Sequence, residues 1–216
     1  MKLKQSVRLF LALFASVCAV FLLTGCTART NDKETESADE GLKQSEVVIS
    51  FNYQKQFGFA SNQFAVWIED INGNHVKTLY ATFYTAKGGY LDRPESIPMW
   101  VAKFDLENRS EDQVDAITSA TPGSGRLEYF WDLTDEDGDP VALGTVYRYV
   151  VEGSLRWKNH VRYLGTITPG SDPVVTEAEA EYSFEASSGQ EALTKSAEEI
   201  KMLGSVTAEY NPDPGE

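Results

Sequence analysis

The sequence predicts an all-β, mainly antiparallel sandwich with one or two short helices. Short segments rich in aromatic and β-branched residues recur along the chain, and clusters of Gly, Asp, Asn and Pro separate them. Few segments have the apolar spacing of a helix, and no internal repeat indicates a solenoid. Short strands divided by turn signals are typical of an antiparallel sandwich.

The N-terminal strands are expected at residues 47–53 and in a hairpin over residues 62–85. Phe64 and the four residues after it are aromatic or aliphatic, and a polar segment containing Asn72 and Gly73 follows them. Both positions of an Asn-Gly pair tolerate positive φ, which favours a two-residue hairpin turn.

The remaining elements are less regular. Pro94 is suited to open a short helix, in which Ile97, Trp100, Val101 and Phe104 follow a roughly helical spacing. A second helix is expected at residues 191–203. Further strands are expected at residues 127–131, 145–155, 161–168, 174–186 and 206–210.

Residues 1–25 have the layout of a secretory signal peptide, with a basic start, an apolar run over residues 9–23 and small residues at a cleavage point. The run is short for a membrane-spanning helix. The final Leu23-Thr24-Gly25-Cys26 resembles the bacterial lipobox, which implies that the Cys26 thiol receives a diacylglycerol and that Cys26 becomes the mature N-terminus. A lipid anchor on the extracytoplasmic face of the cell membrane is therefore expected.

Composition limits the classes of partner. Residues 26–45 are polar and charged, which predicts a flexible linker, and residues 46–216 are expected to form a single domain. The formal net charge of −14 argues against nucleic acid and against adsorption onto anionic lipid. With Cys18 removed and Cys26 acylated, no thiol is left for a disulfide or a metal site.

An acidic turn is the strongest local pattern. Trp131, a run of Asp and Gly residues, Pro140, Gly144 and Tyr147 together resemble a hairpin of the immunoglobulin-like domain in flagellar hook-capping proteins. The resemblance implies an immunoglobulin-like sandwich and no activity. A calcium site is the functional alternative for the turn, because it offers three closely spaced carboxylates, Asp135, Asp137 and Asp139.

Several spaced motifs resemble the predicted periplasmic family called domain of unknown function 2271. They are FAVWIED from Phe64, VKTL from Val76, PMW from Pro98, DAITSAT from Asp115 and the Trp131 turn. The resemblance extends over about residues 46–210 and implies an exported, β-rich module without an established activity.

The segment Asp115 to Thr121 also resembles the acceptor motif of flavin transferases. That motif consists of an Asp, two variable residues, a Ser or Thr, a Gly, an Ala and a final Thr or Ser. This resemblance implies a phosphoester between FMN and the Thr121 hydroxyl, with Asp115 and Thr118 as the other motif residues. Ser119 stands where the motif has Gly, and it lacks the conformational freedom of Gly. A polar loop leading to the next strand is the alternative interpretation.

Other candidates for chemistry are weak. His75 is expected to be solvated and His160 to lie in a turn, and the two form no metal-binding pair. No paired carboxylates or nucleophile motif stand out, so no catalysis by the chain itself is expected. Four tryptophans invite a carbohydrate-binding hypothesis; two of them, Trp67 and Trp131, are expected between the sheets, whereas Trp100 and Trp157 are candidates for exposure.

Two functions from different classes follow. The first is a lipid-anchored accessory or binding module that presents a surface to another envelope protein. The second is a covalent FMN carrier modified on Thr121 by a flavin transferase. A calcium- or carbohydrate-binding sandwich is a further alternative.

Overall fold

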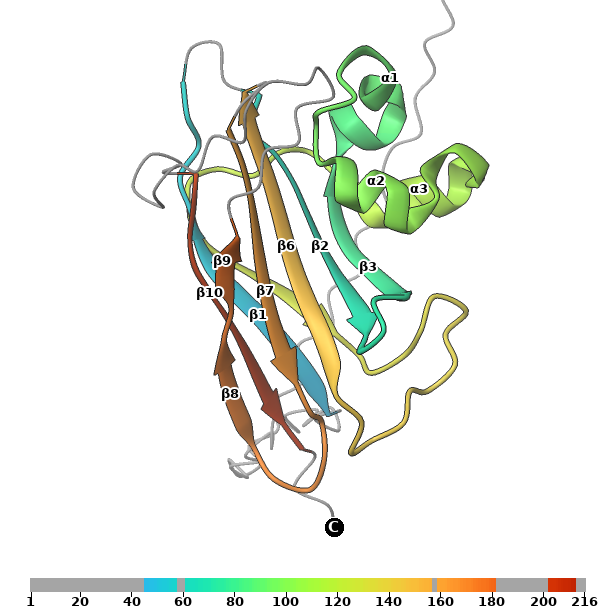
Figure 1. Ribbon diagram of the computed structural model, residues 1–216, viewed down its shortest axis with the longest axis vertical. Helices are drawn as coiled ribbons and strands as arrows, with labels where there is room; N and C mark the ends of the chain where they lie inside the picture. The colour runs from blue at the N-terminus through green and yellow to red at the C-terminus, as the bar shows by residue number, and fades with distance from the viewer. Residues whose placement is uncertain (1–44, 58–60, 157–158, 182–201, 213–216) are drawn as a thin grey trace, which may run out of the picture. The chain divides into compact units, whose positions relative to one another are not determined.

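The computed structural model describes residues 45–57, 61–156, 159–181 and 202–212. Within them, two β-sheets pack face to face, and short helices cover one outer face (Figure 1). The sheets are antiparallel throughout, except for one short parallel pair. The predicted all-β sandwich with short helices is confirmed.

The four-stranded sheet contains the first and last described strands side by side. It consists of β1 (Glu46–Tyr53), β5 (Gly125–Trp131), β8 (Val174–Glu177) and β10 (Leu203–Asn211), in the order β5-β1-β10-β8. Alternate side chains of β1 and β10 point inward, as expected for strands with one face in the core and one face in water. The predicted first and last strands are therefore confirmed.

The six-stranded sheet has β2 near its middle. It consists of β2 (Gln63–Asp70), β3 (His75–Thr82), β4 (Thr118–Ser119), β6 (Tyr147–Arg156), β7 (Asn159–Ile167) and β9 (Glu179–Glu181), in the order β4-β3-β2-β6-β7-β9. β2 is buried along both faces, because one face packs against the other sheet and the other lies beneath helices.

The predicted hairpin joins β2 to β3, but its turn differs in detail. The Gly73 amide donates to the Asp70 carbonyl, and Gly73 has φ of +82° whereas Asn72 is not in the left-handed region. One carboxylate oxygen of Asp70 accepts from the amides of Asn72 and Asn74, both at 2.8 Å. The loop is thus a four-residue connection held by Asp70, and only its glycine needs positive φ.

Aromatic and aliphatic side chains fill the space between the sheets. Trp131 is fully buried there and packs edge-on against Tyr147, with ring centroids 5.1 Å apart. Burying one large apolar side chain stabilises the fold by about 1.5–3 kcal/mol. The prediction that Trp131 fills the inter-sheet core is confirmed, whereas Trp67 is buried on the opposite face of its sheet, under the helices.

The helical layer forms a second core over β2 and β3 (Figure 1). It comprises η1 (Thr85–Gly89), α1 (Tyr90–Asp92), α2 (Pro98–Phe104), η2 (Leu106–Asn108) and α3 (Glu111–Ile117). The rings of Trp100 and Phe104 stack with centroids 5.3 Å apart, and both are buried against Trp67 and its neighbours. The predicted helix begins at Pro98 instead of Pro94, and Trp100 is not exposed.

β5 and β6 do not form the expected hairpin. β5 pairs with β1 in the four-stranded sheet, and β6 pairs with β2 and β7 in the six-stranded sheet. The acidic segment between them therefore crosses from one sheet to the other. Its local order comes from a bridge between Thr134 and Pro140 and from Gly138, which has φ of +86°.

The segment expected as one strand over residues 174–186 is divided between the sheets. Residues 174–177 form β8, residues 179–181 form β9, and the Ala178 amide at the division donates to the Val206 carbonyl. Residues 182–201, with most of the helix expected at 191–203, lie outside the described residues, and Leu203 begins β10 instead of ending a helix. In the part of the chain that is described, no helix has the length and apolarity needed to span a membrane.

Candidate functional site

The Asp115–Thr121 segment is the part of the chain that leads from the helical layer back to the sheets. Its first three residues form the last turn of α3, Thr118 and Ser119 form β4, and the chain then continues to β5. α3 begins with a capping box, in which Ser110 and Gln113 each accept a hydrogen bond from the other's backbone amide. Buried Val114 holds the helix on the second core. The candidate residues are therefore placed by a fixed local structure.

β4 is the segment's attachment to the six-stranded sheet. It runs parallel to the end of β3, with Thr118 opposite Ala81 and Ser119 opposite Thr82. Ser119 is in a strand and is not among the residues with positive φ. The Ser that replaces the motif's Gly is therefore in a conformation open to any residue, so it causes no backbone strain here.

Thr121 is partly exposed, and hydrogen bonds hold the chain at the residue before it and three residues after it. Before it, the Ala120 carbonyl accepts a hydrogen bond of 3.4 Å from the Tyr80 hydroxyl. After it, the Ser124 hydroxyl accepts from the Lys55 amide at 2.9 Å. Burial raises the pKa of Tyr80 to about 12, so its hydroxyl stays neutral and remains a donor at physiological pH.

The side chains of Asp115 and Thr118 do not contact the side chain of Thr121. Asp115 forms an ion pair with Lys87 of η1, and Glu111 lies 3.6 Å from the same ammonium nitrogen. The hydrogen bond to Asp115 raises the pKa of Lys87. Asp115 thus connects α3 to η1, while Thr118 is partly buried in the β4 pairing.

A groove of about 340 Å³ opens beside the last turn of α3. Its lining comes from β3, α2, α3, β5 and the acidic segment, namely Lys77, Thr78, Leu79, Phe104, Ala116, Ile117, Phe130 and Glu136. Phe130 is 55% exposed although it is a large apolar ring. Sequence reasoning missed this groove, because its residues are up to about sixty positions apart and no local pattern connects them.

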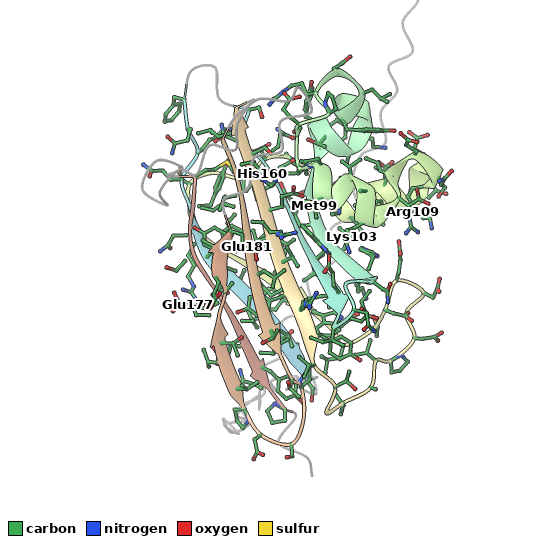
Figure 2. The ribbon with its side chains drawn as sticks, in the orientation of Figure 1. Met99, Lys103, Arg109, His160, Glu177 and Glu181 are labelled. Carbon is green, nitrogen blue, oxygen red and sulfur yellow. The ribbon has the colours of Figure 1, made fainter. Side chains whose placement is uncertain are left out.

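A fully buried carboxylate lies under the start of α2. Glu152 of β6 accepts hydrogen bonds from the amides of Met99 at 3.1 Å and Trp100 at 2.7 Å, and His160 Nε2 lies 2.5 Å from it. Met99 and His160 approach from a helix and a strand (Figure 2). His160 is therefore a buried residue of β7, contrary to the predicted turn. Glu152 satisfies amides that a helix N-terminus leaves unpaired.

The side chain of His75 is largely covered, contrary to the prediction that it is solvated. Its side chain is 8% exposed, its Nε2 lies 2.8 Å from the Thr78 hydroxyl, and its Nδ1 lies 3.4 Å from Glu136. Trp100 Nε1 donates to the same Thr78 oxygen at 3.1 Å. Burial, with smaller contributions from the Arg109 and Lys103 cations (Figure 2), lowers the pKa of His75 to about 4.

The depressed pKa of His75 predicts a loss of stability in acid. Well above pH 6.5 the ring is neutral in both folded and unfolded chains, so the full stability is present. As the pH falls toward 4, the unfolded chain binds a proton that the folded chain does not, which removes about 3 kcal/mol. Urea unfolding across this range measures the effect. His75→Gln should flatten the profile, and equal profiles for the two proteins would contradict the assignment.

The calcium and carbohydrate hypotheses find little support in the structure. Asp135 accepts hydrogen bonds from the amides of Asp137 and Asp139, so it stabilises its own loop. The described residues contain no group of three potential ligands that could hold a metal ion. Three of the four tryptophans are buried, and Trp157 lies outside the described residues.

Comparison with known proteins identifies a family. The sequence profile of the family described as predicted periplasmic protein (DUF2271) matches residues 44–183. The match confirms the resemblance inferred from the spaced motifs, although it ends before β10. No curated protein and no solved structure is significantly similar to the chain.

Proposed function

Because the chain belongs to the predicted periplasmic family DUF2271, we propose that it is a lipid-anchored extracytoplasmic carrier of FMN, attached covalently at Thr121. The observation that supports the attachment is the placement of Thr121. The residue is partly exposed and lies on a short loop that hydrogen bonds from Tyr80 and Lys55 hold at either side. An acceptor hydroxyl must be accessible to a second enzyme, and the partial exposure of Thr121 supports this role.

The modification is a phosphoryl transfer between a flavin nucleotide and the chain. The Thr121 oxygen forms a bond to the FMN phosphorus of FAD, the pyrophosphate bond breaks, and AMP leaves. The hydroxyl proton passes to a base of the flavin transferase, because a threonine hydroxyl is a poor nucleophile. The transferase also supplies the metal ion that offsets phosphate charge. No step requires catalysis by this chain.

The chain's own part is to present and to locate the cofactor. When bound, FMN supplies reversible transfer of one or two electrons. The Cys26 lipid holds the protein at the membrane surface, and residues 26–45 separate the lipid from the domain. Because the domain is negatively charged, it does not adsorb onto anionic lipid, and the attached lipid is therefore the means of attachment. The proposed partners are thus the membrane, a flavin transferase and a redox protein of the envelope.

The binding-module alternative rests on Trp100 and Trp157 as candidates for an exposed apolar patch, and Trp157 lies outside the described residues. Trp100, a candidate for an exposed apolar patch, is fully buried in the helical layer.

Intact mass after co-expression with a flavin transferase tests the proposal. The wild-type chain is expected to gain the mass of one FMN less one water, and Thr121→Val is expected to gain nothing because valine has the shape of threonine without its hydroxyl. Thr121→Ser retains a hydroxyl and serves as the matched control, with a gain expected. An unchanged wild-type mass, or an equal gain on Thr121→Val, would reject the proposal.

A further inference from the structure

The groove beside α3 has an apolar part and a charged part. Leu79, Ile117 and Phe130 form the apolar part. Lys77 and Glu136 form the charged part. Its volume of about 340 Å³ is within the range of about 300–1,000 Å³ that is usual for sites of small molecules.

The groove is linked to the proposed attachment point through the sequence and through one hydrogen bond. Ala116 and Ile117, which line it, precede Thr121 by a few residues. The strand residue Leu79, which also lines it, is followed by Tyr80, whose hydroxyl contacts the carbonyl of Ala120. A ribityl chain separates the phosphate of FMN from its ring, so a ring that is attached at Thr121 can occupy a neighbouring groove.

We infer that this groove seats the isoalloxazine ring of the FMN on Thr121, an inference that rests on the function proposed above. The ring is flat, with an apolar dimethylbenzene edge and a polar pyrimidine edge, so its two edges correspond to the two parts of the groove. Phe130, which is 55% exposed, provides an aromatic surface for offset stacking. Covering it removes apolar surface from water.

The two charged residues of the groove are held by hydrogen bonds and ion pairs to neighbouring side chains. Lys77 Nζ lies 2.8 Å from an Asp132 oxygen and also contacts the Thr134 hydroxyl. Glu136 accepts from Arg109, at 2.8 Å and 2.9 Å. Because Asp132 and Thr134 accept from this ammonium group, and the Thr134 hydroxyl itself donates to Asp132, Lys77 acts toward the pyrimidine edge of the ring as a fixed positive charge. Fixed polar groups of this kind bind a ligand without a further cost of ordering.

Visible circular dichroism of the flavin tests the inference on the full, flavinylated chain. A ring that is held on one face of the protein gives a strong visible signal, whereas a freely rotating ring does not. The wild-type protein should give this signal, and Phe130→Ala should lose most of it while its intact mass shows the same FMN gain. Phe130→Tyr, which keeps an aromatic surface, should restore the signal. Phe83→Ala is the matched control, since Phe83 is 53% exposed and does not line the groove.

The outcomes separate this inference from the proposed function. Full FMN gain with equal visible signals in wild type and Phe130→Ala would overturn the groove assignment alone and leave the carrier role intact. An equal loss of signal in Phe83→Ala would also overturn it. Absence of any FMN gain on the wild-type chain would overturn both. Loss of signal confined to Phe130→Ala would support the groove as the ring site.

Discussion

Glu152→Ala is expected to destabilise the domain by about 3–5 kcal/mol, the usual cost of removing one partner from a buried charged network. The substitution leaves the amides of Met99 and Trp100 without their acceptor at the start of α2, and it removes one hydrogen-bond partner of His160. A domain of this size is stable by about 5–15 kcal/mol, so the loss is a large fraction of the total. The midpoint of urea unfolding measures it.

Glu177→Ala is the control for this prediction. Glu177 is an exposed glutamate of β8 (Figure 2), and replacing it should change the stability by less than about 0.5 kcal/mol. Glu152→Gln should fall between the two, because its one carbonyl oxygen can accept from one of the amides. Equal urea midpoints for Glu152→Ala and the wild-type protein would show that Glu152 does not support α2.

Cys26→Ser is expected to abolish lipid attachment completely. The hydroxyl of serine does not replace the thiol that forms the thioether to diacylglycerol, and stable anchoring needs at least two acyl chains or an equivalent signal. Cells that are grown with labelled fatty acid should label the wild-type protein and leave Cys26→Ser unlabelled. The membrane fraction should correspondingly lose the variant.

The chain contains its own control for the lipid experiment. Cys18→Ser alters the other cysteine, which lies within the apolar run of the signal segment, and this variant should be labelled like the wild-type protein. A label that persists on Cys26→Ser, or a wild-type protein without any label, would contradict the expected anchor.

The sequence predicts the strands well because their signal is local. In β1, residues 47 to 53 alternate between core and outer face, and Phe64 to Ile68 are aromatic or aliphatic throughout. The lack of alternation in β2 indicates burial on both faces, and this signal could have placed Trp67 under the helices instead of between the sheets. Pairing partners are not a local property. The separation of β5 and β6 into different sheets was therefore missed.

The candidate site is predicted only in part, for the same reason. The motif Asp115 to Thr121 is contiguous, so it was found from the sequence. The groove combines Leu79, Ile117 and Phe130 from three separate elements. The burial of His75 depends on Thr78, which is local, and on Glu136, which is not. Residues whose environment is set by distant partners cannot be assigned from spacing alone.

Peptide mapping of the protein from its native envelope tests the central claim most directly. Trypsin is expected to release residues 110–126, which contain Thr118, Ser119 and Thr121. The account predicts that this peptide has visible flavin absorbance and that fragmentation locates FMN on Thr121. An unmodified peptide in cells that contain an active flavin transferase, or FMN on Thr118 or Ser119 instead, would contradict it.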